Sequence, residues 1–144
     1  MSAPIPSEVV RRRADIGDAM SRLERALAKP AAPGDQWRAQ VAAAVAGLGS
    51  LAKEQIAAYT ADDGVLAEVV ERAPRLASHV VRVRELIESL PPRVDTLASE
   101  VTGVEIDQVR EHALRLLADF LRARQKLADL VWDAYSVDLG GDSS

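Results

Sequence analysis

The sequence predicts an all-α protein, and most simply an antiparallel four-helix bundle formed by a single domain over residues 1–144. Apolar residues recur at steps of three and four over four long segments, which is the spacing of one face of an α-helix. Proline- and glycine-rich breaks of modest length separate these segments, as expected between antiparallel neighbours. With 48% hydrophobic and 28% charged residues, the chain can bury a substantial core. The alternative, an extended coiled coil, is disfavoured by the turn-rich breaks and the wide apolar faces.

The first two helices are expected over residues 7–28 and 36–59, with short tails at both ends of the chain. Ser7 is a suitable N-cap for the first helix, and Asp35, which follows the break "KPAAPGD", is a suitable N-cap for the second. One polar residue, Gln55, falls on the buried line of the second helix. The apolar positions are Val9, Ile16, Met20, Leu23 and Leu27 in the first helix and Trp37, Val41, Ala44, Leu48, Leu51 and Ala58 in the second.

The third helix is expected over residues 63–90, after the turn "TADDG", in which one of the two aspartates is expected to cap the helix. Its apolar phase continues across Pro74, which predicts one helix kinked near Pro74 or two short helices bent at Ala73. The segment "LPPRV" is expected to end it, with room for a short helical turn over residues 94–101. Its apolar positions are Leu66, Val69, Ala73, Leu76, Val80, Val83, Ile87 and Leu90.

The fourth helix is expected over residues 103–136. Thr102 and Glu105 have the spacing of a capping box, in which the two side chains satisfy reciprocal backbone donors at the helix start. The apolar stripe that follows is Val109, Ala113, Leu116, Phe120, Ala123, Leu127, Leu130 and Ala134. Four further residues are expected to widen this buried face, namely Leu114, Leu117, Leu121 and Val131.

Composition and charge argue against several classes of protein. The net charge of -4 argues against nucleic-acid binding, because such binding requires a basic face on the protein. The chain contains no cysteine, and therefore no disulfide and no thiolate ligand or nucleophile. The most apolar run, "VAAAVAGLGSLA", is too short to cross a membrane. The start "MSAPIPSEVVRRR" has no apolar core typical of a secretory signal, so a cytoplasmic protein is expected.

The sequence predicts no catalytic site, no metal site and no cofactor. Ferritin-like bundles hold metal with Glu-x-x-His motifs, and neither His79 nor His112 has a glutamate three residues before it. Each histidine is expected at the edge of a buried stripe, with solvent or a backbone group as its partner. A mononuclear site built on His112 and Glu111 stays open, although no spacing supports it. The serines lack a glycine-elbow context or an evident histidine partner.

Two stretches, "GVLAEVVERAPRLASHVVRVRELIESL" and "ARQKLADLVWDAYSVDLGG", resemble a group of hemerythrin-like bacterial bundle proteins over roughly residues 37–141. In that group the last helix typically reads His-Arg-Gln, then Asp-Leu-(Val/Ile)-Tyr-Glu-Ala-Tyr, then Val-Asp and Gly-Gly. The resemblance places Ala123, Ile87 and Gln55 where the last, third and second helices of the group carry metal-ligand histidines. It implies a member of the group that has lost its metal centre.

The same resemblance covers the end of the last helix. Trp132 and Tyr135 match the terminal aromatic pair of the group, and we expect them to close the end of the bundle as core residues rather than to contact a partner. Asp129 and Asp133 match acidic positions, and we expect them to be solvated or paired with arginines.

Three functions are compatible with these patterns. The first is a non-catalytic bundle that acts as an interaction or structural module, as a monomer or homodimer with an unidentified protein partner. The second is a binder of a small apolar ligand in the vacated centre, where Gln55, Ile87 and Ala123 would be the binding residues and Gln55 the lone polar group. The third is a residual iron- or oxygen-binding protein. It would require carboxylates to turn inward, and the candidates are Glu54, Asp62, Glu68 and Glu85.

Overall fold

The computed structural model describes the backbone of residues 7–140 and the side chains of residues 15–136. Every regular element within this range is helical, which confirms the all-α prediction. The elements are α1 (Ser7–Ala28), α2 (Gly34–Thr60), α3 (Val65–Arg72), the 3-10 turn η1 (Pro74–Leu76), α4 (Ala77–Glu88), α5 (Leu90–Glu100) and α6 (Ile106–Gly140).

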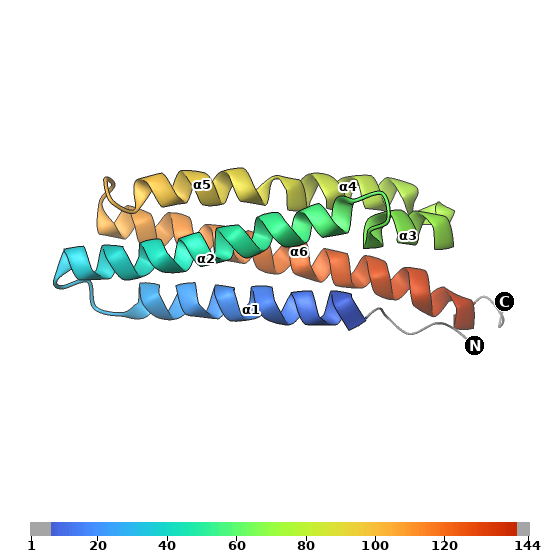
Figure 1. The fold of residues 1–144 in the computed structure, drawn as a ribbon, viewed down its shortest axis with the longest axis horizontal. Coiled ribbons are helices and arrows are strands. Elements are labelled where there is room, and N and C mark those ends of the chain that lie inside the picture. Colours follow the sequence, from blue (N-terminus) through green and yellow to red (C-terminus); the bar gives the residue numbers. More distant parts are fainter. Residues whose placement is uncertain (1–6, 141–144) are drawn as a thin grey trace.

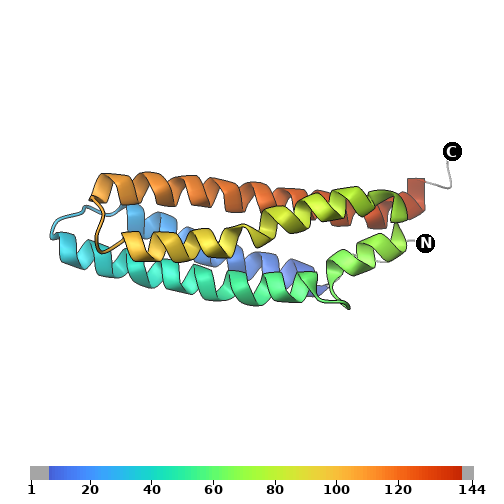
Figure 2. The same cartoon turned by 90° about the horizontal axis from the view of Figure 1, so that it is seen from above.

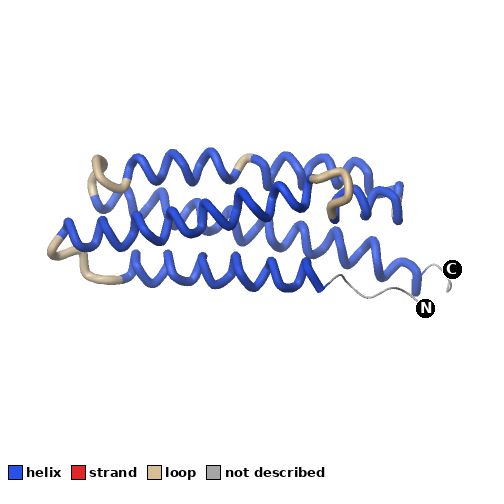
Figure 3. Tube along the Cα trace, in the orientation of Figure 1, coloured by secondary structure: helices blue, strands red, loops and turns tan. Residues whose placement is uncertain are grey.

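The described helices form four rods that lie side by side along the long axis of the molecule (Figures 1 and 2). The rods are α1, α2, the pair α4 and α5, and α6, and successive rods run in opposite directions. Figure 3 shows that most loops lie at the ends of the rods. Helix α1 packs on α2, α2 packs on α5, and α6 contacts both α1 and the α4–α5 rod. The core therefore lies along the axis that the four rods enclose.

Of the two predicted alternatives for the third segment, the structure shows the second, two shorter helices that bend at Ala73. Helix α3 ends at Arg72, and Ala73 leaves the helical conformation with φ -139° and ψ 79°. Pro74 has no N–H with which to continue the helical hydrogen bonds, and its ring disfavours a helical residue before it. Figure 2 shows α3 extending toward the end of the molecule and the chain then turning back into α4. The apolar residues before and after the break nevertheless face the same core, because all eight predicted positions of this segment are buried.

The third helix ends next to the segment "LPPRV", as predicted, but the rod continues beyond this segment as a new helix. Helix α4 ends at Glu88, and α5 begins at Leu90 with proline in its first turn. Proline is tolerated there because the first N–H groups of a helix have no intrahelical partner. The predicted short turn over residues 94–101 is consequently part of an 11-residue helix that continues the direction of α4 (Figure 1).

The predicted capping residues are wrong at three helix starts. Helix α2 begins at Gly34, so Asp35 lies inside its first turn. The N-cap of α3 is Gly64 rather than an aspartate of "TADDG", and it makes no side-chain hydrogen bond. Helix α6 begins at Ile106, which leaves Thr102 four residues before the helix. Asp35 still lies where a carboxylate interacts favourably with the helix dipole.

Close backbone packing explains why a glycine occupies the start of α3. A Cβ atom at Gly64 would collide with the carbonyl oxygens of Ala58 and Tyr59 in the last turn of α2. The chain can turn from α2 into α3 at this point only because Gly64 has no side chain. The neighbouring aspartates are exposed.

The predicted apolar stripes of α1 and α2 are largely buried, although Val9 lies outside the described side chains. In α2 the face is wider than predicted, because this helix packs on both α1 and α5. Three predicted positions, Ala44, Leu51 and Ala58, are only half-buried. The residues that follow these three, Val45, Ala52 and Tyr59, are buried instead, and Gly49 is buried beside the predicted Leu48.

All eight residues of the predicted α6 stripe are buried. Of the four further residues that were predicted to widen this buried face, only two are buried. Leu117 and Val131 are buried, whereas Leu114 is 52% exposed and Leu121 is 59% exposed. The difference follows from the position of α6 between α1 and the α4–α5 rod, which covers the inner side and both flanks but leaves the outer face uncovered. None of the helices described has the length and apolarity that crossing a bilayer would demand.

Candidate functional site

The three residues singled out in the sequence, Gln55, Ile87 and Ala123, come together around one small cavity at the centre of the rods. Each is at most 4% exposed. They lie on three different helices, α2, α4 and α6, at the inward positions that the apolar periodicity assigned to them. The cavity has a volume of about 40 Å³.

Apolar side chains form most of the remaining cavity wall. They come from all four rods and are Ile16, Ala52, Ile56, Leu90, Phe120 and Leu127. Tyr59 and Arg124 also line the space. The Arg124 guanidinium reaches across to α1, where its Nη1 lies 3.7 Å from the Met20 sulfur, so its aliphatic stem is the part suited to an apolar wall.

Gln55 is the one buried polar residue among the described side chains, and its Oε1 atom has no hydrogen-bond partner there. An unpaired buried amide oxygen is costly unless water satisfies it. A site for one water needs roughly 10–15 Å³, so about 40 Å³ leaves room for one to three water molecules. The arrangement can therefore hold water or a very small molecule beside a single hydrogen-bond acceptor.

We expect Gln55→Met to raise the free energy of unfolding by about 1 kcal/mol, because it removes an unpaired buried oxygen while keeping a side chain of similar length. Urea denaturation measures the change. Gln108→Met is the matched control, because Gln108 is exposed, and it should stay within about 0.5 kcal/mol of the wild type. A loss of stability in Gln55→Met would show that the amide is already satisfied, for example through water.

The residues around the cavity do not fit a metal centre of the kind that the resembled group carries. Neither a histidine nor a carboxylate lines it. Among the described residues, no group of three or more histidine, aspartate or glutamate side chains is placed to hold a metal ion. The four carboxylates that a residual iron site would need to turn inward, Glu54, Asp62, Glu68 and Glu85, are all exposed.

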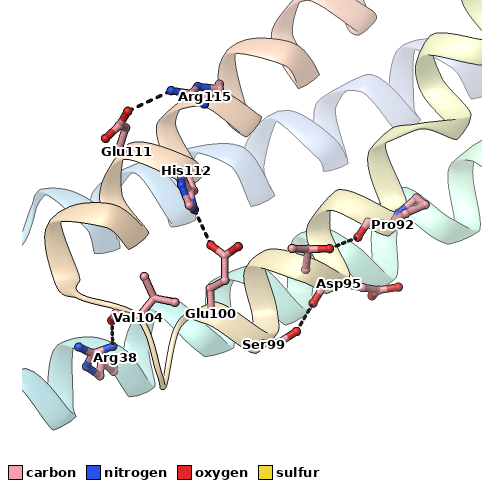
Figure 4. Close-up of polar contacts among 10 residues, drawn as sticks. Arg38, Pro92, Asp95, Ser99, Glu100, Val104, Glu111, His112 and Arg115 are labelled. Carbon is pink, nitrogen blue, oxygen red and sulfur yellow. Dashed lines mark hydrogen bonds and ion pairs between the residues drawn. The ribbon is translucent and has the colours of Figure 1, made fainter.

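The two histidines lie away from the centre. His79 is exposed and lines a groove between α4 and α6. His112 is exposed too, and its Nδ1 atom lies 2.5 Å from Glu100 Oε2 at the end of α5 (Figure 4). His79 is therefore open to solvent, as expected, whereas the partner of His112 is a carboxylate rather than a backbone group or solvent.

Arg38 secures the turn between α5 and α6, and the sequence patterns did not identify it. Its Nη1 donates hydrogen bonds to the carbonyl oxygens of Val101 at 2.5 Å and Val104 at 2.7 Å, and Figure 4 draws the bond to Val104. Such a guanidinium satisfies carbonyls that the end of a helix leaves unpaired. These contacts span more than 60 residues of sequence, and no local spacing could have revealed them.

The two terminal aromatic residues have different environments, which corrects the expectation that both are core residues. Tyr135 is buried, with the Arg72 guanidinium 4.3 Å from its ring centre. Burial, and then the nearby Glu68 carboxylate, raise the pKa of the Tyr135 hydroxyl to about 12. No hydrogen bond to this hydroxyl meets the usual distance and angle limits, so Glu68 acts on it as a neighbouring charge. Trp132, in contrast, is 64% exposed.

The two aspartates near this end of α6 lie at the surface, as expected. Asp133 pairs with Arg75 of η1, with Nη2 and Oδ1 3.3 Å apart. Asp129 accepts a hydrogen bond of 2.9 Å from the Gln125 amide one turn earlier. These contacts are exposed, and such pairs contribute little to stability.

Comparison with protein-family models, curated proteins and solved structures gives no significant match to this chain. The resemblance to hemerythrin-like bundles therefore stays a prediction that rests on the residues quoted for it.

Proposed function

We propose that this chain is an antiparallel four-helix bundle of the hemerythrin-like kind, without a working metal centre, and that it acts as a non-catalytic interaction or structural module. The observation that supports the proposal most is the composition of the central cavity. The three positions where the resemblance expects ligands carry an amide, an isoleucine and an alanine, and they converge on one space.

The chemistry of the cavity wall agrees with this proposal. Metal centres in bundles are built from imidazole and carboxylate groups on facing helices. The wall offers instead a largely hydrocarbon surface with one amide and one phenol, while Arg124 extends its guanidinium toward Met20 of α1. An activity that depends on ionised groups in the centre has no histidine or carboxylate there to perform it.

Metal analysis of protein purified from iron-supplemented cells tests the proposal. We expect well under one iron per chain, because the centre lacks the usual ligand types. A double variant, His79→Asn with His112→Asn, controls for metal held by the exposed histidines. About two irons per chain, retained in the double variant, would contradict the loss of the metal centre.

The second candidate function is the binding of a small apolar ligand in the same centre. It is favoured by the presence of a cavity with an almost wholly apolar wall. Its size restricts the ligand, because a cavity of roughly 150 Å³ is needed to hold benzene whereas this one measures about 40 Å³. A molecule of only a few heavy atoms would fit without rearrangement.

A further inference from the structure

The outer face of α6 carries a second apolar stripe that nothing in the chain covers among the described residues. Three of the four large exposed hydrophobic residues of the described chain lie on it, namely Leu114, Leu121 and Trp132. The fourth, Val81, belongs to α4. Exposed tryptophan and leucine on one helix face are typical of surfaces that associate with other proteins.

The spacing of this stripe is that of a coiled-coil seam. We call it the outer seam, and its members are Leu114, Ala118, Leu121, Gln125, Ala128 and Trp132. The steps between them alternate strictly between four and three residues, over a length of about 27 Å at 1.5 Å per residue. Two alanines allow close approach of another helix, and a single polar residue in such a seam commonly fixes its register.

The flanks of the outer seam differ. On one flank, Leu117 and Val131 are buried, and the Arg110 side chain donates a 3.2 Å hydrogen bond to the carbonyl oxygen of Leu27 in α1. That flank is turned toward α1. The other flank carries Arg115, Arg122 and Asp129, all exposed. Only this second flank can offer charges to a helix that docks on the seam.

The charges of that flank would pair with opposite charges if a second copy of α6 lay alongside the first in the reverse direction. Arg122 and Asp129 lie seven residues apart, which is two helical turns. If a second α6 lies antiparallel on the first, Arg122 of each copy meets Asp129 of the other copy. The same alignment sets Leu121 against Trp132 of the second copy and Gln125 against Ala128 of the second copy.

We propose that the outer seam of α6 is a homodimer interface in which two copies of this chain pack their α6 helices antiparallel about a two-fold axis. The second copy is the occupant that fits, because the seam from Leu121 to Trp132 faces the same stretch of the reversed copy, with the charges of the flank in the matching order. A parallel arrangement does not fit, because it would place the charged flank of one copy against the flank of the other that faces α1. An interface made mainly by one helix of each copy buries little surface compared with most specific complexes, so we expect dimerisation to depend on concentration.

This inference deepens the proposed role as an interaction module by naming the partner. The failure of one proposal can nevertheless be told from the failure of the other. The iron content tests the centre of the rods, whereas the molecular mass in solution tests the outer face of α6.

Analytical ultracentrifugation of the whole chain tests the interface. The wild type should shift from 15.5 kDa in dilute solution toward twice that mass as its concentration rises. Leu121→Asp places a charge in the middle of the seam and should remain at 15.5 kDa throughout, with unchanged helix content because Leu121 is exposed. Val81→Asp is the matched control, since Val81 is 55% exposed on another helix, and it should dimerise like the wild type.

A charge exchange tests the antiparallel register. Arg122→Asp places two like charges opposite each other at both ends of the interface, and so does Asp129→Arg. Each variant alone should therefore dimerise at least about tenfold more weakly than the wild type. An equimolar mixture should recover the wild-type affinity, because only the mixed dimer pairs opposite charges.

A wild type that stays at 15.5 kDa at every accessible concentration would overturn the proposal. Dimerisation of Leu121→Asp with wild-type affinity would do the same. A mixture that associates no better than its two components would show that the antiparallel alignment is wrong.

Discussion

Ala123→Asp should lower the free energy of unfolding by several kcal/mol, on the order of 3 kcal/mol. Ala123 is 2% exposed and lines the central cavity, where Gln55 and Ile87 are its neighbours across the space. An aspartate there would bury a carboxylate without a compensating ion pair, because the Arg124 guanidinium points to Met20 on α1. Urea denaturation at neutral pH measures the effect.

Ala46→Asp is the matched control, because it makes the same replacement at an exposed position of α2. It should cost only the difference in helix propensity between alanine and aspartate, about 0.7 kcal/mol. Equal losses in the two variants would mean that position 123 faces solvent, and the correspondence between this helix and the last helix of hemerythrin-like proteins would then fail.

The pH dependence gives a second readout of the same variant. Burial would raise the pKa of the introduced carboxyl above its usual value, because the low-dielectric cavity disfavours the charged form. The folded variant then binds its proton more tightly than the unfolded chain. The stability deficit should consequently shrink as the pH falls through the raised pKa, whereas the deficit of Ala46→Asp should change little.

Apolar periodicity predicted the buried faces of this chain because a helix in contact with its neighbours must bury one arc of its surface. The eight stripe residues of α6 show this, since all are buried. The same reasoning failed at Leu114 and Leu121, because periodicity reports that a residue is apolar and not whether another rod is there to cover it. Their exposure depends on where α1, α4 and α5 lie.

Helix boundaries were predicted less well than helix faces, and each failure has a local cause. The capping preference of aspartate was overridden at Gly64, where packing against α2 tolerates no Cβ atom. The segment "LPPRV" ends one helix as predicted, but it also starts α5, because proline suits the first turn of a helix. The break at Pro74, in contrast, agrees with one of the two predicted alternatives, because the chain leaves the helical conformation at Ala73.

The candidate site was predictable in its position and not in its contents. Resemblance and periodicity together selected Gln55, Ile87 and Ala123, and the structure places all three on one cavity. Whether the centre was repacked could not be derived from the sequence, because it depends on how far side chains such as Phe120 and Leu127 close the space. Arg38 was missed for a related reason, since its partners are brought to it only by the tertiary fold.

Phe120→Ala should destabilise the protein by about 3–5 kcal/mol and open the centre to benzene. Phe120 is buried on α6 and forms part of the cavity wall, so removing its ring adds the ring volume to a space of about 40 Å³. A cavity near 150 Å³ with an apolar wall stays dry and accepts benzene. The melting temperature of Phe120→Ala should therefore rise when benzene is added, because the ligand binds only the folded state.

The wild type and Leu121→Ala should show no such rise, because the wild-type cavity is too small for benzene and Leu121 is exposed on the same helix. Leu121→Ala should also keep nearly the full stability of the wild type in dilute solution. If Phe120→Ala loses stability but gains nothing from benzene, its neighbours have collapsed into the vacated volume. A centre that collapses in this way would argue against ligand binding there and leave the interaction role as the better account of the chain.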